Sequence, residues 1–231
     1  MLLHSDLKRS PESDCPYLKE KKWRTDYFFA SGLTGDELEE LLSRGWRKFG
    51  IYYFRPSCLD CEECVPIRLL TSDIRLSKSM KRVLRKGGDI EVFFHEPEYR
   101  DEIFQMYQKH SHVRFEKTSS HSDFMHSFYM PSCPGLQSEY FLDGILVAVG
   151  FLDISSAALS SIYFIYDTDY SEYSLGTLSV IKEAQYAASL GLPYYYLGYY
   201  VKDNSSMSYK NSFHRNEKMD WKTGEWIIEE D

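Results

Sequence analysis

The sequence predicts a mixed α+β protein in which a small cysteine-rich region precedes a larger domain. Segments with helical apolar periodicity alternate with β-branched and aromatic runs through most of the chain. Four of the five cysteines lie before residue 65, and three of these are spaced two residues apart. We therefore expect a cysteine-rich domain over residues 1–75 and a second domain over residues 76–231.

Composition limits the class of protein. The 231 residues are 43% hydrophobic and 27% charged, which is ordinary for a globular protein and excludes a disordered chain. No run reaches the 18 or so apolar residues of a membrane-spanning helix, and the first residues lack the pattern of a signal peptide. We therefore expect a cytoplasmic protein without a membrane partner. Aromatic residues make up 16% of the chain, which favours aromatic-rich strands, with base stacking as the alternative.

The first half of the chain contains one short helix, several β-prone segments and a basic helix. Acidic residues in the first turn, followed by spaced leucines, indicate a helix over residues 36–42. Gly87 and Gly88 follow the basic helix and are typical of a helix end. The strands are expected at residues 49–54, 65–70 and 90–94.

The second half has a clear order of elements. Asp143-Gly144 predicts a tight hairpin turn between two strands, and Gly191 with Pro193 ends the last long helix. In that helix we expect Leu178, Ile181, Ala184 and Ala188 to face inward. The helices are expected at residues 99–110, 121–129 and 175–189, and the strands at 138–142, 145–154, 158–167 and 194–200.

This order of strand, hairpin, strand, strand, helix and strand is the core order of the GNAT acyltransferase fold. The helix that follows the third long strand would direct its first N–H groups into the cleft, where they favour a phosphate or a developing oxyanion. Coenzyme-A-using members carry a glycine-rich loop led by Arg or Gln at this point. This chain has Ser174-Leu-Gly176-Thr instead, which disfavours acetyl-CoA as the donor.

The clustered cysteines predict a metal site. Two intervening residues allow Cys58, Cys61 and Cys64 to direct thiolates at one ion, and Cys15 is the candidate fourth ligand. The ligand set suits zinc or an iron–sulfur cluster, and free thiols or disulfides remain the alternative. Four protein ligands leave no open position for catalysis, so the metal would be structural. Cys133 is expected to lie outside this set.

Charge is unevenly distributed along the chain. The formal net charge is -8, which argues against general coating of DNA or RNA. Residues 65–90 nevertheless carry seven Lys or Arg against two Asp. Lys78, Arg82 and Arg85 share one helical face. This face is either a solvated surface or a small phosphate-binding stripe.

Several sequence strings, taken in order, resemble the aminoacyl-tRNA–protein transferase family. The similarity extends from Cys15 to about Trp226. The strings in the first half are Cys15-Pro-Tyr-Leu18, Gly45-Trp-Arg-Lys-Phe-Gly50 and Phe54-Arg-Pro-Ser-Cys58. Those in the second half are Ser161-Ile-Tyr-Phe-Ile-Tyr-Asp167, Ser174-Leu-Gly-Thr177, Pro193-Tyr-Tyr-Tyr-Leu-Gly-Tyr-Tyr200 and Met207-Ser-Tyr-Lys210.

The resemblance implies an enzyme that adds a destabilising residue from an aminoacyl-tRNA to proteins with N-terminal Asp or Glu, without a nucleotide cofactor. The short chain favours the compact bacterial leucyl branch, and the arginyl branch is the alternative. Three strings depart from the expected leucyl pattern: residues 76–82, Asp167-Thr168 and Tyr107-Gln-Lys-His110. A coenzyme-A acyltransferase and a non-enzymatic module that binds acidic N-termini are the competing interpretations.

Candidate site residues follow from this chemistry. Asp167 is the candidate base, with His110 and His112 as alternatives. Lys210 and Tyr209 are further catalytic candidates. An acidic N-terminus requires a cationic pocket, for which Arg82, Arg114 and Lys210 are candidates. Tyr199, Ser174 and Gly176 are expected to contact substrate, and the candidates for tRNA phosphates are Arg75, Lys78, Lys81, Arg82 and Arg85.

Overall fold

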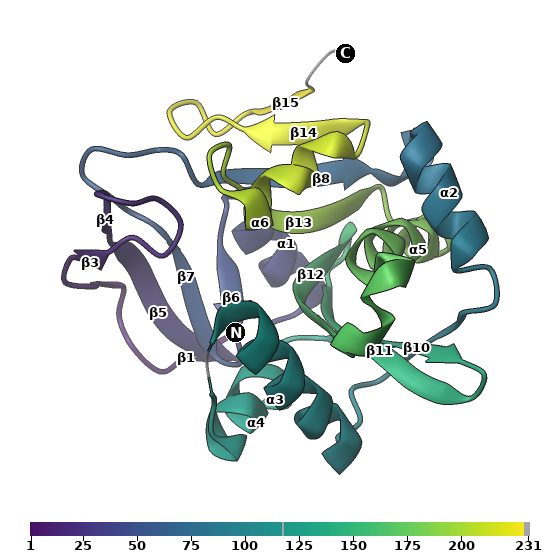
Figure 1. Cartoon of the computed structure of the whole chain (residues 1–231). Helices are drawn as coiled ribbons and strands as arrows, with labels where there is room; N and C mark the ends of the chain where they lie inside the picture. Colours follow the sequence, from purple (N-terminus) through teal and green to yellow (C-terminus); the bar gives the residue numbers. More distant parts are fainter. Residues whose placement is uncertain (117, 229–231) are drawn as a thin grey trace.

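The computed structural model describes residues 1–116 and 118–228 (Figure 1). It contains both helices and strands throughout, which confirms the predicted mixed architecture. An eight-stranded sheet is the largest element, in the order β15-β14-β8-β13-β12-β11-β10-β9. Its strands are β8 (Val65–Leu70), β9 (Glu91–His95), β10 (Gly135–Leu142), β11 (Ile145–Ile154), β12 (Ala158–Tyr166), β13 (Tyr194–Tyr200), β14 (Asn216–Met219) and β15 (Trp226–Ile228).

A smaller sheet forms from the N-terminal region, in the order β1-β5-β7-β6, with β2 also pairing with β5. A separate pair, β3 and β4, lies beside the cysteines. Most of these strands are short and were not predicted, because a two-residue strand is too short to show an alternation of apolar and polar residues. Their bounds are β1 (Leu2–Leu3), β2 (Lys8–Arg9), β3 (Ser13–Asp14), β4 (Lys22–Trp23), β5 (Thr25–Ser31), β6 (Arg47–Phe49) and β7 (Tyr52–Pro56).

The helices pack around the two sheets (Figure 1). Thr34 and Glu37 form a capping box at the start of α1, so the predicted helix over residues 36–42 is confirmed. The α-helices are α1 (Gly35–Ser43), α2 (Lys78–Lys86), α3 (Asp101–Phe115), α4 (His121–Phe128), α5 (Leu175–Ser189) and α6 (Ser205–Ser208). Three 3₁₀ turns complete the fold: η1 (Thr71–Asp73), η2 (Thr168–Tyr173) and η3 (Tyr209–Ser212).

The main core lies between α5 and the large sheet. Val180, Ile181, Ala184 and Ala187 pack against strand residues such as Leu159. The prediction that Ala188 faces inward is wrong, because the buried stripe of the helix runs through residues 180, 183, 184 and 187 and leaves Ala188 exposed.

The single strand predicted over residues 49–54 is also wrong. The structure turns at Gly50 and forms the hairpin β6–β7. Gly50 has φ +54°, and a Cβ there would lie 1.9 Å from the carbonyl oxygen of His126. A residue with a side chain would therefore clash with α4, and the hairpin depends on glycine.

β8 connects the two parts of the chain. It comes from the cysteine-rich third of the sequence but lies inside the large sheet, between β13 and β14. Within the described residues, no helix has the length and apolar character required to cross a bilayer.

Candidate active site

The large sheet opens between β12 and β13, which run parallel, unlike the other neighbouring strands of the described sheet. They pair over three positions, from Ala158 with Tyr194 to Ser160 with Tyr196, and then part. Beyond this point β12 continues against β11 and β13 continues against β8. We call the parted segments, residues 161–166 of β12 and 197–200 of β13, the β12–β13 split.

Arg47 of β6 occupies the start of this split. Its Nη1 donates to Ser160 Oγ at 2.7 Å, and its Nη2 donates to the carbonyl oxygen of Ser161. The guanidinium also approaches Gly198, where a Cβ would lie 3.6 Å from Nε. Arg47 is partly exposed, and burial lowers the pKa of its guanidinium. Arg47 was not predicted to be a site residue from the sequence.

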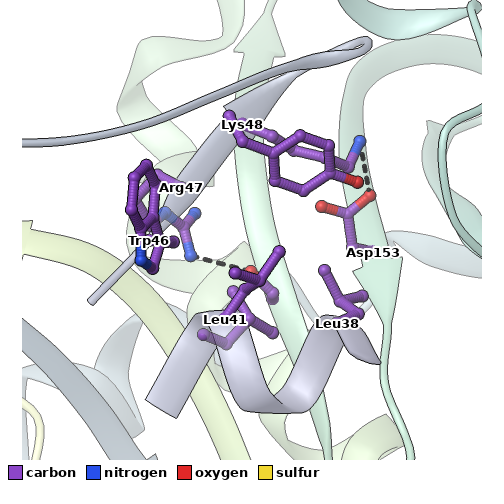
Figure 2. A pocket seen from close by; sticks show the side chains of 9 residues that line it. Leu38, Leu41, Trp46, Arg47, Lys48 and Asp153 are labelled. Atoms are coloured by element: carbon purple, nitrogen blue, oxygen red, sulfur yellow. Dashed lines mark hydrogen bonds and ion pairs between the residues drawn. The ribbon is translucent and has the colours of Figure 1, made fainter. Parts of the chain in front are cut away.

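The neighbouring part of β6 packs against α1. Arg47, Trp46 and Lys48 border a small pocket with space for about one water molecule (Figure 2). Lys48 Nζ lies 2.9 Å from Asp153 Oδ1, and both side chains are buried. This ion pair neutralises Asp153 beside the split.

Lys210 lies on η3 and also approaches the split. It is 9% exposed, and its Nζ donates to the carbonyl oxygen of Tyr199 at 2.9 Å. The same Nζ lies 3.6 Å from the position that a Cβ on Gly198 would occupy. Burial, together with the charge of Arg47, lowers the pKa of the Lys210 ammonium to about 7. The predicted residue Lys210 and the unpredicted Arg47 therefore meet at Gly198.

The two predicted tyrosines have different environments. Tyr199 is buried, and its hydroxyl donates to the carbonyl oxygen of Gly45 at 2.8 Å. Tyr209, next to Lys210, is 42% exposed. Burial nevertheless raises the pKa of the Tyr209 hydroxyl to about 12, with a contribution from the charge of Glu183. Tyr209 therefore keeps its proton at neutral pH and can donate it in a hydrogen bond.

Glu183 of α5 is a buried carboxyl that was not predicted from the sequence. Its Oε1 accepts hydrogen bonds from Ser138 Oγ at 2.9 Å and Tyr140 Oη at 3.2 Å, and its Oε2 accepts from Tyr195 Oη. Burial raises the pKa of Glu183 to about 7. The signal that could have revealed it is an acidic residue within the apolar face of an otherwise buried helix.

Asp167, the candidate base, lies at the end of β12 and caps η2. Burial raises the pKa of its carboxyl, but hydrogen bonds from Lys109 and from the backbone N–H of Asp169 outweigh this effect and lower it. The paired carboxylate is therefore a weak proton acceptor at neutral pH. The alternative candidate bases are His110 and His112. Burial lowers the pKa of His110 to about 4, and His112 is exposed.

The remaining substrate candidates lie around α3 and the start of α5. Arg114 is exposed on α3, and its Nη1 donates to Tyr166 Oη at 3.2 Å. Ser174 is exposed and adopts φ +53° at the start of α5 without a side-chain capping bond. Space around Gly176 is open, since nothing lies within 4 Å of the position of a Cβ.

The basic candidates gather on α2. Met80 lies on the buried face of this helix, whereas the exposed residues are Lys78, Lys81, Arg82 and Arg85. None of these four forms an ion pair with a described residue. Figure 1 shows α2 on one side of α5 and α6 on the other. Arg82 thus belongs to the α2 surface and not to the split. Arg75, just before α2, lies 3.4 Å from Asp73.

The four predicted metal ligands line one pocket of about 190 Å³, together with Trp23 and Trp221. Burial and the neighbouring thiols of Cys15, Cys58 and Cys61 raise the pKa of Cys64 to about 12. In the described part of the chain, no three potential metal ligands lie close enough together to coordinate one ion. The donor set still fits a thiolate-bound metal, because all four cysteines line the same pocket. Cys133 lies elsewhere, beside Asp153.

Comparisons with known proteins cover nearly the whole chain. Residues 13–82 match the family model described as arginine-tRNA-protein transferase, N terminus, and residues 99–220 match the corresponding C-terminal model. The chain is 36% identical to an aspartate/glutamate leucyltransferase of Campylobacter jejuni, over 89% of each protein. It is 32% identical to that of Helicobacter hepaticus, over 88% of each. Among solved structures, L-PGS from Bacillus licheniformis matches with a TM-score of 0.49 and 12% identity, over 79% of this chain and 55% of that one.

Proposed function

The chain belongs to the arginine-tRNA-protein transferase family, and on this premise we propose that it transfers leucine from Leu-tRNA to the N-terminal Asp or Glu of proteins. The observation that carries the proposal is the 36% identity to an aspartate/glutamate leucyltransferase over 89% of both chains. This similarity favours leucine over arginine as the donor. The product would carry a destabilising N-terminal leucine and would be marked for degradation.

The chemistry joins an amine to an activated ester. The neutral α-amine of the acceptor attacks the carbonyl carbon of the aminoacyl ester. The tetrahedral intermediate then collapses to a peptide bond, and the ribose oxygen of the tRNA leaves with a proton. Because a protein α-amino group has a pKa near 8, an appreciable fraction is neutral at physiological pH, and no strong base is required.

We place this reaction at the β12–β13 split, within a GNAT-like fold. The order of β10 to β13 around α5 and the parting of two parallel strands support that assignment. The protonated Tyr209 hydroxyl would donate a hydrogen bond to the reacting ester, and Lys210 would lie beside it in the split. The ends of the bound substrates would contact Arg114, Ser174 and Gly176. Asp167 would help to hold η2 against α3 through Lys109, and Tyr199 would support the wall of the split.

The α2 surface is our candidate for tRNA phosphates. Its exposed Lys78, Lys81, Arg82 and Arg85 lack carboxylate partners in the described chain, so their charges remain available to a polyanion. Arg75, which precedes α2, is the fifth candidate. A localised stripe on a protein of net charge -8 suits brief contact with one folded RNA in the cytoplasm.

Cys15, Cys58, Cys61 and Cys64 would hold a structural zinc ion or iron–sulfur cluster, which would cross-link the N-terminal segment to the start of β8. Cys64 packs against Tyr199 of β13 and Val201 just after that strand. The cysteine region therefore supports one wall of the split without entering the chemistry.

The proposal is tested by incubating the purified protein with separately labelled Leu-tRNA and Arg-tRNA and a peptide that begins with Asp. We expect the peptide mass to increase by one leucine residue. Addition of arginine would overturn the donor assignment. Addition of neither residue by folded, metal-loaded protein that still binds the peptide would favour a binding module over an enzyme.

A further inference from the structure

Two basic side chains meet in the β12–β13 split. Arg47 and Lys210 both approach Gly198, with nitrogen atoms 3.6 Å from the same point in space. Neither forms an ion pair with any carboxylate of residues 1–116 and 118–228. Lys210 is almost fully buried and Arg47 partly so. Burial and the charge of Arg47 oppose the charged form of Lys210, and an anion bound between the two groups would favour that form.

The nearby carboxylates do not supply that anion. Asp153 is the carboxylate whose charge acts on Arg47, but it is already paired with Lys48 at 2.9 Å. Glu183 is enclosed by Ser138, Tyr140 and Tyr195, which occupy both of its oxygens. The positive charge in the split is therefore not compensated by these groups.

Backbone contacts alone do not explain the two charges. Arg47 donates to the carbonyl of Ser161 on β12, and Lys210 donates to the carbonyl of Tyr199 on β13. These carbonyls lie on opposite walls of the split, where the strands no longer pair. A neutral donor such as Gln would satisfy each carbonyl without the cost of a desolvated charge. Two cations in these positions instead create an anion-binding site with one donor group on each wall.

We propose that Arg47 and Lys210 bind the carboxylate side chain of the acceptor's N-terminal Asp or Glu. This assignment rests on the proposed function, since it names the residues that select its acceptor. Arginine can bind a carboxylate through paired N–H groups, and lysine adds a point charge. Glycine at position 198 leaves room between them, because any side chain there would enter the space next to both nitrogens. The α-amine of the acceptor would then lie toward Tyr209, which directly precedes Lys210 in η3.

The experiment compares two acceptor peptides that differ only in the first residue, Asp or Asn, with Leu-tRNA as donor. We measure kcat/KM for each peptide with wild type, Arg47→Gln and Lys210→Met. The wild type should prefer Asp, and each variant should reduce that preference by about tenfold or more, mainly by losing activity toward Asp. Arg55→Gln is the matched control, because Arg55 lies on the adjacent strand and stacks on Trp46. It should keep the wild-type preference.

Binding of fluorescent Asp and Asn peptides without tRNA separates side-chain recognition from other roles. We expect Arg47→Gln to weaken binding of the Asp peptide only. Equal losses toward both peptides would overturn the assignment and indicate an oxyanion or tRNA phosphate as the anion. If Arg47→Gln fails to fold, Arg47→Lys and Lys210→Met carry the test, and an unchanged Asp preference in both rejects it. Absence of any leucine transfer by wild type would reject the proposed function itself.

Discussion

Glu183 is a carboxyl group held by three hydroxyls in place of a cation. The hydroxyls of Ser138, Tyr140 and Tyr195 come from two strands of the large sheet and meet on α5. Gly150 makes room for this arrangement, since a Cβ there would lie 2.5 Å from Glu183 Oε1. The network fixes the helix to the sheet directly beneath the site.

This environment predicts a pH dependence of stability. The pKa of Glu183 is about 7 in the folded protein and near 4.5 when the chain is unfolded. The folded state therefore binds more protons between these values, and the free energy of unfolding falls as the pH rises from about 4.5 to about 7. The loss should be on the order of 3 kcal/mol.

Urea unfolding at pH 5 and pH 7.5 checks this prediction when wild type is compared with Glu183→Gln. Glutamine keeps the shape and one acceptor oxygen, replaces the other oxygen with an N–H donor and cannot ionise. The variant should be less sensitive to pH than wild type over this range. Equal pH dependence in the two proteins would show that Glu183 ionises normally.

The candidate site could be predicted from sequence only in part. Lys210 was selected because it follows the last core strand in a recognisable string. Arg47 lies in an equally distinctive string, Gly45-Trp-Arg-Lys-Phe-Gly50, but more than 100 residues earlier, and nothing local indicates that it enters the split. Arg82 and Arg114 were selected by charge alone. Charge gives no information about direction, and the structure places Arg82 on α2.

At the scale of elements, α2 combines a buried apolar position with an exposed basic face. Ser77 caps the helix through Met80 N, and Gly87 follows its end. Lys86 pairs with Glu172 at 2.8 Å, whereas no ion pair with a described residue involves Lys78, Lys81, Arg82 or Arg85. Such a helix is positioned by its packing against α5 and is free to present its charges to a ligand.

Reversing two of these charges should change the salt dependence of tRNA binding. Each lost phosphate contact reduces the slope of log K against log salt by about 0.7 to 0.9. We therefore expect Lys78→Glu with Arg82→Glu to reduce the slope by about 1.5, measured by filter binding over a salt series. Lys8→Glu with Lys222→Glu makes the same charge change on exposed residues elsewhere and should leave the slope unchanged. An unaltered slope in the α2 variant would exclude the stripe from the tRNA interface.

Long elements were predictable because their patterns are repeated many times. β11 and β13 match the expected ranges, and α5 was found with its end at Gly191, which adopts φ +73°. The N-terminal strands were missed because they are short and depend on partners far away in sequence. The β6–β7 hairpin was missed because Gly50 is required by the approach of α4, a tertiary contact.

At the scale of the whole molecule, the cysteine pocket joins the N-terminal region to the large sheet. Trp221, next to β14, donates from Nε1 to the carbonyl oxygen of Cys64 at 3.1 Å. Tyr17 packs edge-on against Trp23 on the other side of the pocket. A metal held here would stabilise contacts between segments that are about 200 residues apart.

Removing one ligand should therefore destabilise the whole protein. Cys61→Ala should lower bound metal and reduce Tm by more than about 5 °C, since a tetrahedral set loses one of four bonds. Metal analysis and thermal unfolding, with and without a chelator, provide the measurement. Cys133→Ala is the control for cysteine loss outside the pocket and should retain metal. Full metal content in Cys61→Ala would exclude Cys61 as a ligand.

The interior position of β8 has a consequence for biosynthesis. The ribosome releases β8 early, but its partners β13 and β14 emerge only about 130 and 150 residues later. Throughout this interval both edges of an apolar strand lack their partners on the nascent chain, a condition that promotes aggregation. Premature termination before residue 216 would leave one edge of β8 permanently open. Truncated translation products of this protein should therefore depend on chaperones or be degraded, whereas the complete chain protects both edges.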